Sequence, residues 1–201
     1  SSTNNQIYLS ANGRSVAYFK DGRDSTTANT GGLYMLSLEN RISGRILPLT
    51  SLVQRGFFSD PAWTRDGSAL AMAVATGYDI DIFTIGSDGA NLRNLTNNGS
   101  YDIWPSWSPD GSKLMFVSDR DTCPSWIPTD ETHCDPTLTT PPIDGSVVGS
   151  IYLMDIKTGE TRRLTEQKVS EPPRWLNNST ITFATGDPTL ADPPERRLWI
   201  E

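Results

Sequence analysis

IWPSWSPDGSKLMFVSDRD, the stretch from Ile103 to Asp121, places a Pro-Asp-Gly turn between a tryptophan-rich segment and an apolar run. Asp110 and Gly111 are residue types that tolerate the positive φ that tight hairpins require. The stretch therefore predicts an edge strand that ends at Trp107, a short turn and a second, more apolar strand.

The same pattern occurs elsewhere in the chain, which makes it a structural repeat rather than a single reactive site. It returns as SDPAWTRDGSALAMAV in Ser59 to Val74, and more loosely as SEPPRWLNNSTITFAT (Ser170 to Thr185) and QIYLSANGRSVAYF (Gln6 to Phe19). Trp107 follows Trp63 by 44 positions. A period of about 40–45 residues is typical of a four-stranded propeller blade.

Each copy is followed by an apolar run, a polar turn and, in the first three units, a Leu-Thr ending, which predicts two more strands. Within the expected strands, prolines fall only in the first and the fourth, at Pro48, Pro61, Pro105, Pro172 and Pro173. Proline cannot donate to a central ladder, so this distribution fits the edges of a four-stranded sheet. We therefore expect an all-β propeller domain or fragment of antiparallel blades, about 3.75 in number, at residues 6–50, 57–96, 102–165 and 170–201.

The number of blades raises the question of closure. Propellers have roughly four to eight blades, and six or seven blades at this period need on the order of 250–310 residues. We therefore expect these 201 residues to be part of a larger propeller or to be completed by another chain. A closed four-bladed ring would need the short polar segment Ser1 to Asn5 to supply an outer strand, whereas an open ring leaves strand edges that invite assembly.

WSPDGSKLMFVSDRD followed by IYLMDIKTGETRRLT resembles the repeat of TolB-like β-propellers. The resemblance covers nearly the whole chain, although Leu9 replaces the tryptophan in the first unit and Asn177-Asn178 replaces Asp-Gly in the fourth. Similar propellers serve as periplasmic protein-interaction modules, as non-catalytic domains of prolyl-oligopeptidase-type peptidases, as sensors and occasionally as lyases. The resemblance thus implies a bacterial binding module, with a domain of a hydrolase or lyase acting on peptide or polysaccharide as the alternative.

Two insertions indicate where a binding surface would lie. Asp21 to Gly32 and Asp119 to Gly149 both fall between the second and third strands of their units, and therefore on one face. Loops on a rigid scaffold commonly carry recognition. Trp126 and Ile127 in the longer insertion need cover or a partner. Trp104 and Trp126 lie outside the register of the repeated tryptophans, so we expect them, with Ile127, to be candidate binding residues, with the two tryptophans as exposed anchors. We expect this face, together with the open blade edges, to bind a protein partner or to assemble.

Carboxylates on the same face raise the possibility of Ca²⁺, which takes oxygen ligands. Asp119 and Asp121 begin the longer insertion, and Asp21 begins the shorter one. The pattern does not match an EF-hand, and solvated loop charge is the simpler interpretation. We therefore expect no cofactor and no metal, and we retain these aspartates as candidate binding residues.

The only cysteines, Cys123 and Cys134, lie 11 positions apart in the longer insertion. One disulfide between them would stabilise the loop by roughly 3 kcal/mol in the chain-entropy model. Two free thiols in a cytosolic protein are the alternative. A disulfide favours a location outside the reducing cytosol, periplasmic or extracellular.

Several function classes are disfavoured by composition. The net charge of −7 offers no electrostatic footprint for nucleic acid, and no apolar stretch is long enough to span a bilayer. His133 is the only histidine, and the chain has no Gly-x-Ser-x-Gly elbow for a serine nucleophile. We therefore expect a protein that is not an enzyme.

Overall fold

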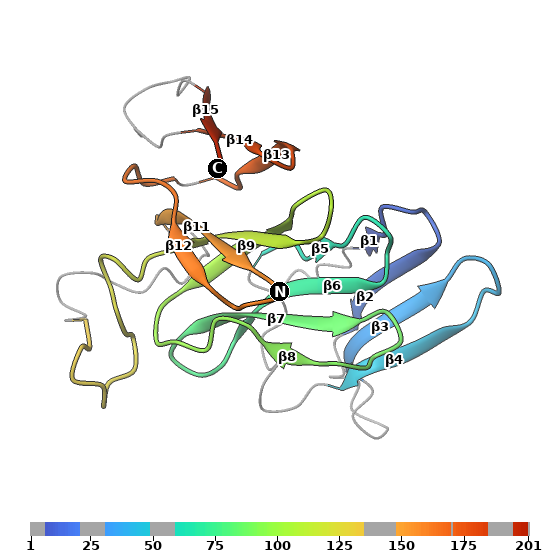
Figure 1. Ribbon diagram of the computed structural model, residues 1–201. Coiled ribbons are helices and arrows are strands. Elements are labelled where there is room, and N and C mark those ends of the chain that lie inside the picture. The colour runs from blue at the N-terminus through green and yellow to red at the C-terminus, as the bar shows by residue number, and fades with distance from the viewer. Residues whose placement is uncertain are drawn as a thin grey trace.

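The computed structural model describes residues 7–20, 31–48, 59–134, 148–169, 171–184 and 195–200. In these ranges the chain forms strands and turns but no helix, and the strands assemble into four antiparallel sheets (Figure 1). The all-β fold that the repeat predicts is therefore confirmed. Ser1 to Asn5, which a closed four-bladed ring would need, lie outside the described residues.

Three of the sheets contain four strands in chain order, and we term them blades 1 to 3. Blade 1 contains β1 (Ile7–Leu9), β2 (Ser15–Lys20), β3 (Gly32–Ser37) and β4 (Ser43–Pro48). Blade 2 contains β5 (Ala62–Trp63), β6 (Ala69–Ala75), β7 (Ile80–Gly86) and β8 (Arg93–Asn94). Blade 3 contains β9 (Asp102–Trp107), β10 (Lys113–Ser118), β11 (Ser150–Asp155) and β12 (Thr161–Arg163). Blade 4, as far as it is described, contains β13 (Arg174–Asn177), β14 (Thr180–Ala184) and β15 (Glu195–Trp199).

One type of turn joins the first two strands of every blade. In blade 3 the Asp110 carboxylate accepts hydrogen bonds from the Ser108 hydroxyl at 2.6 Å and from the Ser112 backbone N–H at 3.0 Å. In the other blades the side-chain oxygens of Asn12, Asp66 and Asn177 each accept the corresponding hydrogen bond from the backbone N–H two residues further along the chain. Asparagine and aspartate side chains both imitate a backbone acceptor in this way. The turn therefore also forms in the blades that lack the Asp-Gly sequence.

Consecutive blades are joined by a repeated hydrogen bond from a tryptophan. The indole Nε1 of Trp63 donates to the Tyr8 carbonyl oxygen at 3.2 Å, that of Trp107 to Ala62 at 3.1 Å, and that of Trp175 to Ser106 at 3.1 Å. Each tryptophan ends the first strand of its blade, or lies within it in blade 4, and each acceptor lies in the first strand of the preceding blade. These tryptophans therefore join neighbouring blades through a specific contact.

The second strand of blade 2, β6, is buried because its side chains alternate between two neighbouring blades. In β6, Leu70, Met72 and Val74 belong to the apolar cluster shared with blade 1, whereas Ala71 and Ala73 belong to the cluster shared with blades 3 and 4. A strand with both faces covered needs an almost continuous apolar sequence.

No helix in the described part of the chain is long and apolar enough to cross a membrane.

Replacing Trp107 tests the junction between blades. Trp107→Phe keeps an aromatic ring but removes the donor to Ala62, and we expect it to lower the free energy of unfolding by about 1 kcal/mol. Trp107→Ala also removes the packed ring, and we expect a loss of about 3–5 kcal/mol. Urea unfolding followed by circular dichroism measures both. Equal stability of Trp107→Phe and wild type would show that the hydrogen bond contributes nothing.

The turns predict an acid-sensitive contribution to stability. Hydrogen bonds from Ser108 and Ser112 lower the pKa of Asp110 to about 2, against about 3.9 for an unfolded chain. A carboxylate with a lowered pKa stabilises the fold above about pH 4, and this contribution is lost as the pH falls through about 2. The gap in urea midpoint between wild type and Asp110→Ala should therefore be wider at pH 6 than at pH 2.5. An unchanged gap would mean that the charge of Asp110 does not stabilise the turn.

Candidate interaction face

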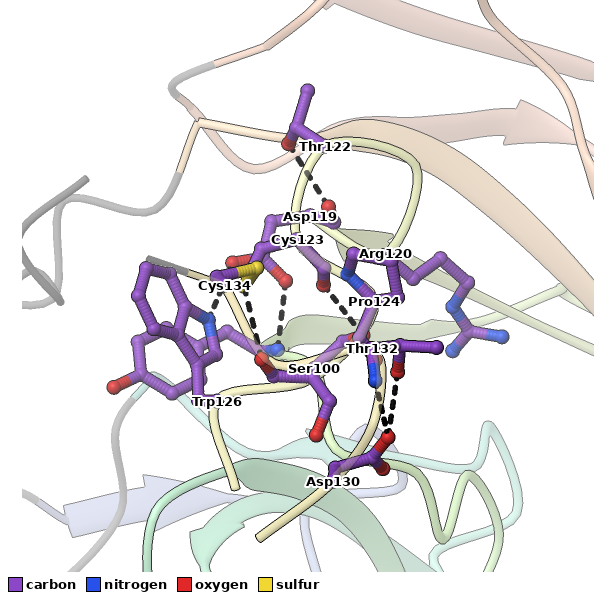
Figure 2. The surroundings of a disulfide bond; sticks show 12 residues. Ser100, Asp119, Arg120, Thr122, Cys123, Pro124, Trp126, Asp130, Thr132 and Cys134 are labelled. Atoms are coloured by element: carbon purple, nitrogen blue, oxygen red, sulfur yellow. Dashed lines mark hydrogen bonds between the residues drawn. A yellow bond between two sulfur atoms is a disulfide. The ribbon is translucent and has the colours of Figure 1, made fainter. Parts of the chain in front are cut away.

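The predicted interaction face is the end of the blades formed by the β6–β7, β8–β9 and β10–β11 connections, which we term the loop face. Asp119 follows β10 and points inward rather than to solvent. Its Oδ1 accepts the Tyr101 backbone N–H at 2.8 Å, and its Oδ2 accepts the Trp126 Nε1–H at 2.9 Å. Figure 2 shows Asp119 and Trp126 beside the disulfide that closes this loop.

Trp126 is covered by its own chain. Its ring stacks on Tyr101 with a centroid distance of 5.2 Å, and only 6% of the residue is exposed. The sequence left open whether this apolar residue takes cover or a partner, and the structure shows cover. The expectation of an exposed aromatic anchor at Trp126 is therefore corrected: the indole has both an apolar neighbour and an acceptor inside the protein, so it is a core residue.

Burial changes the acidity of Asp119. Desolvation raises its pKa to about 6, against the hydrogen bonds from Tyr101 and Trp126, which lower it. Because the same group in an unfolded chain titrates near about 3.9, the folded state holds this proton more tightly. The contribution of Asp119 to stability is therefore most favourable below about pH 4 and falls as the pH rises through about 6.

The predicted disulfide between Cys123 and Cys134 is present, with 5.5 Å between the Cα atoms. The loop that it closes is docked on the β8–β9 connection. The Ser100 hydroxyl donates to the Cys123 and Pro124 carbonyl oxygens, and the Trp126 N–H donates to the Gly99 carbonyl oxygen at 2.6 Å. At Gly99 a Cβ would lie 2.3 Å from the Ser125 Oγ, so this close approach requires glycine.

Asp121 has a different environment, at the surface. Its Oδ2 accepts hydrogen bonds from Lys168 Nζ at 2.5 Å, Ser150 Oγ at 3.0 Å and Arg163 Nη1 at 3.3 Å. Burial alone would raise the pKa of Asp121, but the hydrogen bonds from Lys168 and Ser150 and the charge of Lys168 outweigh it and lower the pKa. Asp121 thus anchors a cluster of charges at the end of blade 3.

The remaining predicted binding residues are Trp104, Ile127 and Asp21, and they differ in how far they are buried and described. Trp104 lies half-buried in β9 with a φ of 54°, where the pairing with β10 is irregular, and its N–H donates to the Ser59 hydroxyl at 3.0 Å. Ile127 is half-buried. Asp21 lies outside the described residues. The roles of these residues in binding stay predictions.

Two buried carboxylates that sequence reasoning missed organise the same face. Asp81, at the start of β7, accepts hydrogen bonds from Asn94, Thr96 and the Asn98 backbone, which fixes the β8–β9 connection. Burial raises its pKa although these bonds oppose the rise. The signal in the sequence was an aspartate inside the otherwise apolar stretch Ile80 to Phe83.

The second of these carboxylates is Asp102. Its side chain is fully buried and pairs with the Arg120 guanidinium at 2.9 Å. The same guanidinium lies over the ring of Tyr152, 4.7 Å from its centroid. Among the described residues, no group of three or more His, Cys, Asp or Glu side chains is arranged to hold a metal ion, and the oxygens of Asp81, Asp102 and Asp119 are occupied by internal donors.

The ionisation of Asp119 can be followed through tryptophan fluorescence. We expect the emission to titrate with a midpoint near pH 6, because protonation of Asp119 changes the acceptor of the Trp126 indole. Asp119→Asn should abolish this transition while keeping an oxygen for the Tyr101 N–H. Asp121→Asn, a matched change at a carboxylate that does not contact Trp126, should leave it in place. A transition that persists in Asp119→Asn would contradict the assignment.

Known proteins resemble this chain in sequence and in fold. Residues 8–130 match the family described as the TolB beta propeller domain. The Protein TolB homolog of Chlorobium luteolum is 29% identical over 154 residues, which are 77% of this chain and 27% of that protein. The matched region therefore spans about a quarter of the relative's length.

Solved structures share the fold at lower identity. An oligogalacturonate lyase in complex with manganese superposes with a TM-score of 0.58 at 19% identity, over 96% of this chain and 49% of that chain. The β-propeller domain of the Trilobed protease from Pyrococcus furiosus gives a TM-score of 0.53 at 13% identity, over 96% of this chain and 56% of that chain. These likenesses concern the fold alone. The family match covers more than half of the sequence and agrees with the blades described above, so this chain belongs to the TolB beta propeller domain family.

Proposed function

We propose that this chain is a non-catalytic module that binds a protein partner through its loop face, in the periplasm or outside the bacterial cell. The observation that carries the proposal is a pair of exposed apolar side chains on adjacent blades. Tyr78, in the β6–β7 connection, and Val148, just before β11, are 64% and 50% exposed. Tyrosine is one of the residue types that dominate binding energy at protein interfaces, and the exposed valine adds apolar surface at the same end of the blades.

The frame beneath these two side chains supports the proposal. Asp81 and Asp119 fix the connections from within, and the disulfide closes the loop that follows β10. A rigid loop loses little conformational entropy when it binds, which favours affinity. The cluster of Asp121, Arg163 and Lys168 adds charges of both signs at the same end, which suits recognition of a polar rim.

The internal engagement of the carboxylates supports a non-catalytic role. General acid–base catalysis needs a group that can reach a substrate proton, whereas the oxygens of Asp81, Asp102 and Asp119 accept hydrogen bonds from within the chain. The likeness to a lyase and to a protease propeller is one of fold and favours no particular reaction. The disulfide supports a location outside the reducing cytosol.

Site-specific photo-crosslinking tests the proposal. A photoreactive phenylalanine analogue in place of Tyr78 should give a discrete crosslinked protein in the native host compartment. The same analogue in place of Leu92, which is exposed in the β7–β8 turn at the opposite end of blade 2, is the matched control and should give none. Equal crosslinking at both positions, or none at position 78, would overturn the proposal. So would a lyase or hydrolase activity of the chain that is lost in Asp121→Ala.

A further inference from the structure

Arg120, in the β10–β11 connection, has a guanidinium that is held in place by hydrogen bonds and by aromatic rings. Its Nε donates to the Ser118 hydroxyl at 2.9 Å, and its Nη2 donates to both carboxylate oxygens of Asp102, at 2.9 and 3.0 Å. The Cζ atom lies 4.7 Å from the ring centroid of Tyr152 and 5.3 Å from that of Phe116. A guanidinium fixed in this way loses little freedom when it binds a further group.

One nitrogen of this guanidinium is not used inside the protein. Nη1 of Arg120 donates to no group in the described part of the chain, and 26% of the side chain is exposed. The nearby carboxylates have other donors: Asp102 also accepts the Asn98 Nδ2–H at 2.6 Å, and Asp121 is engaged by the lysine, serine and arginine described above. Figure 2 shows the Arg120 side chain pointing away from the disulfide. Neutralising the buried Asp102 therefore leaves Arg120 with a free donor.

The hydroxyl of Tyr152 is a second free donor beside the first. It has no hydrogen-bond partner among the residues that the structure describes, and its ring stacks on Phe116 with a centroid distance of 5.9 Å. Burial raises the pKa of Tyr152, so the hydroxyl keeps its proton at neutral pH. Arg163 lies opposite Tyr152 in the pairing of β11 with β12, and its side chain is 40% exposed. Two cations and a hydroxyl thus lie on one side of blade 3.

Packing between blades does not require this arrangement. The strand register places Met72 and Phe83 of blade 2 at the positions that Phe116 and Tyr152 occupy in blade 3. Both are buried apolar side chains, and blade 2 packs between its neighbours with them. The tryptophan donors, which do serve packing, recur from blade to blade.

The charges around Arg120 leave one positive charge in excess. Arg120 and the two cations bonded to Asp121 stand against the carboxylates of Asp102 and Asp121. Glu166, which also contacts Arg163, has a side chain that is 87% exposed and is therefore strongly solvated. A guanidinium N–H and a tyrosine hydroxyl are donors that suit a carboxylate. Arginine and tyrosine are also residue types that dominate binding energy at protein interfaces.

We propose that the Arg120 guanidinium and the Tyr152 hydroxyl form a binding site for a carboxylate, namely an acidic side chain of the protein partner. The proposal rests on the function proposed above and deepens it, because it names the chemistry that the partner presents to the loop face. Binding of a carboxylate can be measured without the partner, so the two proposals fail independently.

Nuclear magnetic resonance tests the site with a defined probe. N-acetyl-glutamate amide carries one carboxylate and should shift the Nε–H resonance of Arg120, which is identified by its absence from the spectrum of Arg120→Lys. N-acetyl-glutamine amide has nearly the same shape without the charge and should leave this resonance in place. Equal shifts with the two amides, or no shift with the glutamate probe, would overturn the site.

Tyr152→Phe removes one hydroxyl and keeps the ring on which the guanidinium lies. It should weaken binding of N-acetyl-glutamate amide about tenfold, the effect of one hydrogen bond to a charged group. Tyr18→Phe is the matched control, because its hydroxyl is already bonded to the Ser43 Oγ at 2.6 Å, and it should not change the affinity. Circular dichroism should show the wild-type strand signal in both variants. Equal affinity of Tyr152→Phe and wild type would contradict the proposed site.

The photo-crosslink at position 78 tests whether the carboxylate belongs to the partner. In the protein that carries the photoreactive residue, Tyr152→Phe should lower the yield of the crosslinked product, whereas Tyr18→Phe should not. An unchanged yield with Tyr152→Phe would overturn the assignment to the partner. Absence of any crosslink at position 78 would overturn the proposed function, and with it the partner as the source of the carboxylate, while the titration decides the site by itself.

Discussion

The hydrogen bond from a tryptophan indole to the carbonyl of the preceding blade sets the architecture of this protein. Because Trp63, Trp107 and Trp175 donate at equivalent positions, each blade is fixed in height relative to the one before it. This fixed relative height aligns the central strands of neighbouring blades. Their alternating side chains are then buried against the blade on either side. The fixed height also brings the strand connections of neighbouring blades to one end, where the loop beyond β10 can dock on the β8–β9 connection.

The fold was predictable because its cause is repeated in the sequence. A tryptophan followed by an Asx turn and an apolar strand recurs at blade spacing, and each element has a local physical reason. The disulfide was predictable because Cys123 and Cys134 are the only cysteines and lie within one loop. The turn of the fourth unit, where Asn177-Asn178 replaces Asp-Gly, also formed, since asparagine provides the same acceptor.

The site was only partly predictable, because its contacts link residues without a shared local pattern. Trp126 takes its cover from Tyr101 and its acceptor from Asp119, and no spacing rule pairs these three residues. The close approach at Gly99 depends on how the loop folds back. Asp81 and Asp102 are buried charges that sequence reasoning treats as surface residues, since burial is tolerable only once their donors are in place.

The two faces of β6 carry side chains of different size, and this limits how blades can be duplicated or deleted in such a chain. Leu70 and Met72 fill the junction with blade 1, whereas the small side chains of Ala71 and Ala73 face the junction that holds Leu114 and Phe116. Interiors packed at crystal-like density tolerate neither a void nor an added side chain at such a junction. The blades share one repeat pattern but are not interchangeable, because the side-chain volumes at each junction fit one particular pair of neighbours. Duplicating or deleting a blade would therefore bring together faces whose side-chain volumes do not match.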